Sequence, residues 1–263
     1  MERIPREIGI PVLTMKFSFL ITVLLACVSV PLIGQATAAP SLLADEAIVR
    51  MLEHEVQSET EAGGYPGNRL DLLDNLGFDK EARMVVSVNC GPDGKKNVRI
   101  VSEQGWKSAN NRVLRQTLEL ESQLSHPEVR PEAQFTPDNY AFQSIKTAPL
   151  DGRLAYVIDV VPKRQDEYLF RGRIWVDTED FALARVEGES ARSPSFWIRS
   201  VHFTQEYRKS GEYWPPWSTD VAIEAEAFGR TEVDIHHFDY LPRSGKTERD
   251  STLELVEVQY GKP

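Results

Sequence analysis

Histidines near the C-terminus are the side chains whose types could hold a metal ion. His236 and His237 are adjacent, Asp234 and Asp239 flank them, and His202 lies further back in the chain. Imidazole nitrogens and carboxylate oxygens are common zinc ligands. Adjacent residues of a strand point to opposite faces of a sheet, however, so His236 and His237 cannot both bind one ion from a regular strand. The spacing therefore favours solvated or core-edge histidines, and we expect neither a metal nor another cofactor.

Other groups in the sequence could carry catalysis. Asp177, Glu179 and Asp180 supply carboxylates for acid and base chemistry, but they fall in a turn-forming segment where solvated charges are the better explanation. Cys90 stands beside a Gly-Pro-Asp-Gly turn and is more typical of a small buried residue than of a nucleophile. The sequence has no G-x-S-x-G elbow, H-E-x-x-H motif, phosphate loop or dinucleotide fingerprint. We therefore predict a binding protein and no enzyme.

The acidic turn belongs to the most informative stretch of the chain, Tyr168 to Gly188. Apolar side chains alternate with polar ones up to Asp177, which is the period of a strand. Residues 177–180 then reverse the chain, and Phe181 to Glu187 is predicted to return as an antiparallel strand.

At this hairpin, the segment G-R-I-W-V-D-T-E-D-F-A-L-A-R-V-E-G resembles the central hairpin of the LolA/LolB-like lipoprotein-carrier superfamily, the group of outer-membrane lipoprotein-sorting proteins. The resemblance extends from about Ala82 to Tyr240. It implies an α+β fold, in which a curved antiparallel sheet forms a half-open β-barrel and helices cover the concave face. It also implies that this face holds acyl chains.

The rest of the chain can supply these elements. Apolar residues recur at helical spacing over residues 41–61 and 108–125, and each stretch predicts a helix. The Gly- and Pro-rich residues 63–67 are expected to interrupt regular structure. Residues 127–137 are expected to form an ordered crossover. Further strands are predicted over 83–89, 97–102, 154–160, 196–207, 218–227 and 230–240.

The N-terminus carries the pattern of an export signal. A basic lead at Met15-Lys16 precedes an apolar run, and Ala36-Thr37-Ala38 gives a small-x-small cleavage site. We predict a signal peptide over residues 1–38, a single LolA-like domain over 39–241, and a C-terminal tail or edge strand over 242–263. Translation can start at Met1 or Met15, and Cys27 leaves a lipid-anchored N-terminus as an alternative to cleavage.

The charge of the chain excludes one class of partner. The sequence carries 30 basic and 40 acidic side chains, a net charge of -10. Phosphate neutralisation needs a basic surface, so we expect no nucleic-acid partner.

Aromatic residues are concentrated where the resemblance is strongest, between Tyr168 and Tyr240. They either fill the core of a curved sheet or line a groove for an apolar ligand, and the sequence leaves both readings open. The residues expected to line such a groove, chosen because alternation places them on apolar faces, are Phe170, Ile174, Val176, Val201, Phe203, Ile223 and Ile235. Four arginines, Arg171, Arg173, Arg185 and Arg199, are expected either to pair across strands on the outer face or to guard the groove mouth.

Together these features predict a monomeric periplasmic protein that holds the acyl chain of a lipid or lipoprotein in a hydrophobic groove and passes it to an outer-membrane acceptor protein. The alternative is an envelope sensor or interaction module on the same fold, in which the groove is filled.

Overall fold

In the computed structural model, one antiparallel sheet of ten strands carries most of the described residues, which are 44–193, 196–226 and 229–240. They belong to one compact unit within Ser41–Pro263. The predicted signal peptide, Cys27 and the C-terminal tail lie outside the described residues and remain predictions.

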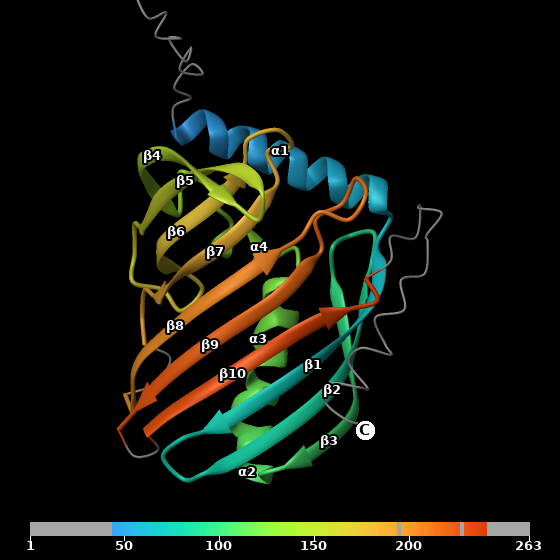
Figure 1. Ribbon diagram of the computed structural model, residues 1–263, viewed down its shortest axis with the longest axis vertical. Helices are drawn as coiled ribbons and strands as arrows, with labels where there is room; N and C mark the ends of the chain where they lie inside the picture. Colours follow the sequence, from blue (N-terminus) through green and yellow to red (C-terminus); the bar gives the residue numbers. More distant parts are fainter. Residues whose placement is uncertain (1–43, 194–195, 227–228, 241–263) are drawn as a thin grey trace, which may run out of the picture. The chain divides into compact units, whose positions relative to one another are not determined.

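The strands run in the order β3-β2-β1-β10-β9-β8-β7-β6-β5-β4 (Figure 1). Neighbours are antiparallel, and β1 beside β10 is the one pairing between strands that are distant in sequence. β3 and β4 are the two edges, so the sheet stays open. The strands are β1 (Tyr65–Asn75), β2 (Lys80–Cys90), β3 (Lys96–Gly105), β4 (Tyr140–Leu150), β5 (Arg153–Pro162), β6 (Phe170–Asp177), β7 (Leu183–Ser190), β8 (Ile198–Tyr207), β9 (Pro216–Ala225) and β10 (Gly229–Phe238).

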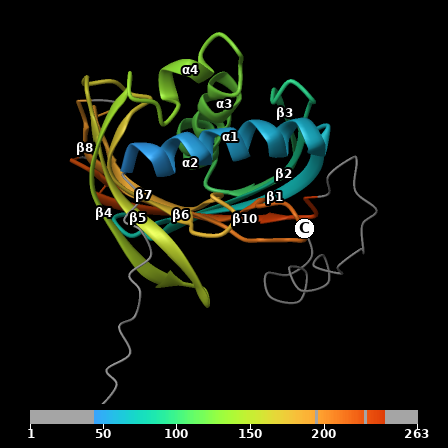
Figure 2. The ribbon, with the colours of Figure 1, turned by 90° about the horizontal axis from the view of Figure 1, so that it is seen from above.

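The described helices all lie on the inner side of the curved sheet (Figure 2). A continuous helical run contains α2, the π-helical turn η1 and α3, and it matches the helix predicted over 108–125. The helix predicted over 41–61 is also confirmed. The helices are α1 (Ala44–Ala62), α2 (Lys107–Ala109), η1 (Asn110–Leu114), α3 (Arg115–Leu124) and α4 (Arg130–Ala133).

Strand alternation decides which side chains meet the helices. In β10, Val233, Ile235 and His237 are buried, whereas Asp234 is exposed on the other face. Residues directly opposite one another on neighbouring strands share a face of the sheet. Val221 and Thr219 of β9, which lie opposite Val233 and Ile235, therefore also point to the concave face. The concave face is therefore built from every second residue of each strand.

Two apolar clusters fill parts of the space between sheet and helices. The first lies under the N-terminal half of α1, where Ile48 and Met51 pack on Phe170, Ile174 and residues around them. The second lies under η1 and α3, where Leu114 and Leu118 pack on β2 and β10. The predicted curved antiparallel sheet with helices on its inner face is thus confirmed, although those helices are few.

One prediction about the N-terminal part is right for two residues and wrong for three. Gly63 and Gly64 interrupt regular structure between α1 and β1, but β1 begins at Tyr65 and contains both Pro66 and Gly67. Proline is tolerated here because β10 pairs with β1 only from Asn68 onward, so the missing N–H of Pro66 removes no bond on that side. β1 joins the N-terminal strands β2 and β3 to β10 and the rest of the sheet.

Candidate functional site

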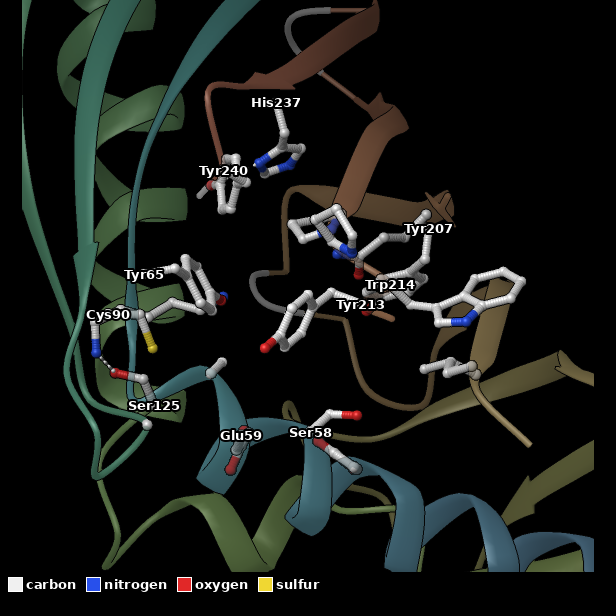
Figure 3. A pocket seen from close by; sticks show the side chains of 18 of the residues that line it. Ser58, Glu59, Tyr65, Cys90, Ser125, Tyr207, Tyr213, Trp214, His237 and Tyr240 are labelled. Carbon is white, nitrogen blue, oxygen red and sulfur yellow. Dashed lines mark hydrogen bonds between the residues drawn. The ribbon is translucent and has the colours of Figure 1, made fainter. Parts of the chain in front are cut away.

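A cavity of about 530 Å³ remains between the two apolar clusters on the concave face. Its walls come from the C-terminal half of α1, from α3, and from the ends of β1, β8, β9 and β10. Figure 3 looks into it: Tyr65 and Tyr213 point into the space from different sides, and Ser58 comes from α1.

Helix α1 changes character along its length. Ile48, in its first half, is fully buried in the apolar cluster. Beyond Met51, the residues at helical spacing on the same face are His54, Ser58 and Ala62, and they line the cavity. Small and polar side chains in this second half leave volume that larger apolar groups would have filled.

Four tyrosines line the cavity: Tyr65, Tyr207, Tyr213 and Tyr240. Among the described residues, the filled cluster under α1 is richer in phenylalanine, although it also contains Tyr140. A tyrosine presents an apolar ring together with a hydroxyl group that can donate or accept a hydrogen bond. The wall is therefore both aromatic and hydrogen-bonding.

Gly67 allows Tyr240 to reach this position. A Cβ at Gly67 would lie 2.7 Å from the ring of Tyr240, so a larger residue in β1 would push the ring away. The Tyr240 hydroxyl lies 3.0 Å from His237 Nδ1, and its ring centroid lies 5.3 Å from that of Tyr65. Glycine at position 67 thus allows the Tyr240 ring to form part of the cavity wall.

Three charged residues of the cavity wall, Arg69, Lys96 and Glu121, are linked to one another and to the buried Asp71. Arg69 binds Asp71 through two hydrogen bonds of 2.8 Å and also contacts Glu121 on α3. Glu121 accepts a 2.9 Å hydrogen bond from Lys96 Nζ. The backbone of Lys96 also bonds Ser125, since its N–H lies 2.9 Å from Ser125 Oγ. These contacts hold the end of α3 against β1 and β3.

The environment fixes the charge of these groups. Burial alone would raise the pKa of Glu121, but the neighbouring charges of Lys96 and Arg69 lower it to about 2. Burial lowers the pKa of His237 to about 3, and the charge of Arg69 adds to the effect, so this imidazole is neutral. Burial also raises the pKa of Tyr65 to about 12, which keeps its hydroxyl protonated.

A second ionic group lies where α1 approaches α4. Arg130 contacts Glu59 and lies 3.4 Å from Glu55, both on α1. Gly94, in the turn between β2 and β3, makes room for this arginine, because a Cβ there would lie 2.5 Å from Arg130 Nη1. Gly94 also has a φ of +76°, which favours glycine.

The seven residues predicted from alternation all lie on the concave face, but they do not form one group. Ile235 lines the cavity. Phe170, Ile174 and Val176 are buried within the filled cluster. The remaining three, Val201, Phe203 and Ile223, are half-buried. Whether any of the seven contacts a ligand stays a prediction.

The predicted arginines lie on the other face of the sheet. Arg173 contacts Glu187, Arg185 contacts Glu206, and Arg199 lies 3.4 Å from Glu226. Pairing across strands is thus confirmed for Arg173 and Arg185, which do not guard the groove mouth, whereas the partner of Arg199 lies just beyond the end of β9. The arginines of the cavity are Arg69 and Arg130.

The histidines are separated as the strand geometry requires. His237 faces the cavity, whereas His236 and His202 belong to the opposite face. In the part of the chain that the structure describes, no group of three or more His, Cys, Asp or Glu side chains is placed to hold a metal ion. No helix in that part is long and apolar enough to cross a membrane.

Sequence reasoning missed the contribution of β1. A signal was present, since Arg69 and Asp71 alternate with leucines in N-R-L-D-L-L. Alternation alone assigns the leucines to the core and the charges to solvent, whereas here Arg69 lines the cavity and Asp71, which it binds, is buried. Leu70 and Leu73 are buried as well, and β1 lies inside the sheet between β2 and β10.

A family model matches residues 107–238, half of the chain, and its description is family of unknown function (DUF5686). The chain belongs to this family. The DUF5686 match runs from α2 to the end of β10, so α1 and β1 lie outside it. Both of these elements supply cavity residues. A comparison with curated proteins gives no match.

Several solved structures match this DUF5686 chain. A LolA superfamily protein from Nitrosomonas europaea matches with a TM-score of 0.42 and 11% identity, over 81% of this chain and 97% of that one. An outer membrane lipoprotein-sorting protein domain from Vibrio parahaemolyticus matches with a TM-score of 0.40 and 12% identity, over 82% and 100%. The MucA/MucB complex of Pseudomonas aeruginosa matches with a TM-score of 0.26 and 10% identity, over 76% and 95%.

Proposed function

We propose that this protein binds an acyl chain in the cavity on its concave face and acts as a periplasmic carrier for a lipid or lipoprotein. The observation that carries the proposal is the space of about 530 Å³ left between two filled clusters. This size lies within the range of roughly 300–1,000 Å³ that small-molecule sites occupy.

The apolar part of the wall supports an acyl ligand. Met51, Leu120, Leu124 and Leu183 line the cavity together with Trp214. At roughly 0.8 kcal/mol for each buried methylene, about ten methylenes would contribute about 8 kcal/mol, equivalent to a Kd near micromolar before ordering costs. That affinity suits transient carriage, because a ligand bound this way can still be released.

Export from the cytoplasm is part of the same proposal and rests on the pattern of residues 1–38. Sequencing the N-terminus of the protein secreted to the periplasm tests it. A start at residue 39 supports cleavage, and a lipid-modified Cys27 supports the anchored alternative.

Native mass spectrometry of the protein purified from its host tests the binding proposal. A mass increment that organic extraction releases as an acyl lipid is expected. Displacement of the neutral dye N-phenyl-1-naphthylamine by 1-monopalmitoylglycerol gives a second measurement. If the protein carries no lipid and binds no dye, the carrier proposal fails and the sensor or interaction module remains.

A pair of variants on α1 sharpens this test. Ser58 lines the cavity and the neighbouring Gln57 is exposed. Ser58→Trp should fill the space and weaken dye binding by at least about tenfold, whereas Gln57→Trp adds the same side chain outside and should leave binding unchanged. Equal binding by the two variants would place the ligand elsewhere.

A further inference from the structure

We propose that the cavity selects ligands whose hydrogen-bonding end is uncharged, such as an acyl ester, over free fatty acids of the same chain length. This selectivity rests on the proposed acyl binding and adds a ligand class to it. It follows from how the charges and the tyrosines of the wall are arranged.

The three cations that line the cavity are already paired. Arg69 contacts Asp71 and Glu121, Lys96 contacts Glu121, and Arg130 contacts Glu59 and Glu55. The carboxylates of the wall are the partners in these same contacts. A charged ligand would therefore have to take a cation from a carboxylate and leave that carboxylate without its partner.

Burial makes such an exchange unfavourable. Arg69 is 2% exposed and Asp71 is fully buried, while Glu121 is 22% exposed. A charge that loses its partner in a desolvated site is strongly destabilised. An anion that binds beside Lys96 would also lie close to Glu121, whose carboxylate stays ionised at neutral pH. Free carboxylates are thus disfavoured at the floor of the cavity.

The tyrosines offer the contacts that an uncharged ligand needs. Tyr65, Tyr207 and Tyr240 line the same cavity as Lys96 and Glu121. A protonated phenol can donate a hydrogen bond to an ester carbonyl without removing a partner from any buried charge. The acyl chain would then lie against the leucines and Trp214 described above.

Competition between matched probes tests this selectivity. N-phenyl-1-naphthylamine is displaced at pH 7.5 by 1-monopalmitoylglycerol or by palmitate, each below its aggregation concentration. We expect the ester to displace the dye at a concentration at least about tenfold lower than palmitate, since a buried unpaired charge opposes the acid. An amidated diacylglyceryl-cysteine peptide is tested in parallel. Tighter binding of this peptide than of 1-monopalmitoylglycerol indicates that the ester comes from a lipoprotein, and the reverse order indicates a free lipid.

The outcomes separate this proposal from the one on which it rests. If palmitate displaces the dye as well as the ester does, the selectivity is wrong and acyl binding stands. If none of the probes displaces the dye, acyl binding itself is wrong.

A change of one carboxylate should reverse the preference. Glu121→Gln removes the negative charge from between Lys96 and Arg69, and Arg69 keeps Asp71 while Lys96 becomes available to an anion. Palmitate binding should rise by about tenfold and ester binding should change by less than about threefold. An unchanged ratio of the two affinities in a folded variant contradicts the proposal.

Glu59→Gln gives the same test should Glu121→Gln fail to fold. It weakens the pairing of Arg130 at a half-buried position of α1, so a smaller rise in palmitate binding is expected. Glu53→Gln is the matched control, because Glu53 is exposed on the same helix and does not line the cavity. Circular dichroism confirms folding of all three variants.

Discussion

Two halves of one concave face differ in how they use aromatic side chains. Under the N-terminal half of α1, Phe135, Phe170 and Phe203 pack edge to face, with ring centroids 5.8 and 5.2 Å apart along the series. Under the C-terminal half, tyrosines and ion-paired side chains together line a cavity. The same helix and the same sheet contribute to both halves, and α3 adds a wall to the hollow one.

Charged contacts help to keep the second half open. Phenylalanine rings can approach one another until the space is filled, since dispersion has few angular requirements. Arg69, Asp71 and Glu121 must keep the distances and angles of their hydrogen bonds, and collapse of the wall would break them. We therefore expect packing to stabilise the filled half, and ion pairs and pH-dependent charges to stabilise the hollow half.

The largest effect is expected in the hollow half, from Arg69→Met. The change leaves Asp71 and Glu121 buried without this partner, so it should lower the free energy of unfolding by about 3–5 kcal/mol. Urea denaturation followed by tryptophan fluorescence measures it. The double variant Arg69→Met with Asp71→Leu should recover part of the loss, and a double variant less stable than Arg69→Met would contradict the pairing.

Packing in the filled half gives the next effect. Ile48 is fully buried, and Ile48→Ala should cost about 2–4 kcal/mol because it opens a cavity among close-packed groups. Leu120→Ala is the matched change in the hollow half, where Leu120 is 39% exposed and already faces open space. It should cost less than about 1 kcal/mol. Comparable losses in the two variants would mean that both halves are packed alike.

The two halves also differ in how far the sequence predicts them. Alternation placed Phe170, Ile174 and Val176 on the inner face correctly, because apolar residues face the core, whereas their expected contact with a ligand stays a prediction. The hollow half breaks this rule. Arg69 and Asp71 face inward, and their burial depends on Glu121, which is distant in sequence.

The part of the site that the sequence does not predict depends on pairing between strands that are distant in sequence. β1 lies between β2 and β10 because β10 returns beside it from the far end of the described chain. No local pattern in residues 65–75 encodes that neighbour. The sequence thus predicts the curved sheet and its helical cover, while the cavity emerges only once β1, β10 and α3 are placed together.

A pH dependence of intermediate size is expected from His237. Its pKa falls from 6.5 to about 3 on folding because burial disfavours the charged form. The unfolded state therefore binds the proton more readily, so this contribution to stability is complete above pH 6.5 and is lost as the pH falls toward 3. About 2 kcal/mol should disappear between pH 6.5 and pH 5.

Urea denaturation at a series of pH values measures this loss. His237→Gln should flatten the profile in that window, since it removes the titrating group and keeps a polar side chain. Ile48→Ala, in the filled half, should shift the profile downward without changing its slope. A slope that survives His237→Gln would assign the acid sensitivity to another group.

The smallest effect is expected from deleting single hydroxyl groups. Tyr207→Phe in the hollow half should change the free energy of unfolding by less than about 1 kcal/mol but weaken binding of 1-monopalmitoylglycerol by about fivefold, the equivalent of one hydrogen bond. Tyr140→Phe is its counterpart in the filled half, where the Tyr140 hydroxyl lies 3.4 Å from the backbone nitrogen of Phe170. It should cost about 1 kcal/mol of stability and leave the affinity unchanged. Dye displacement measures ligand affinity and urea denaturation measures stability for both variants. If the two variants weaken binding equally, the distinction between a filled half and a hollow half is wrong.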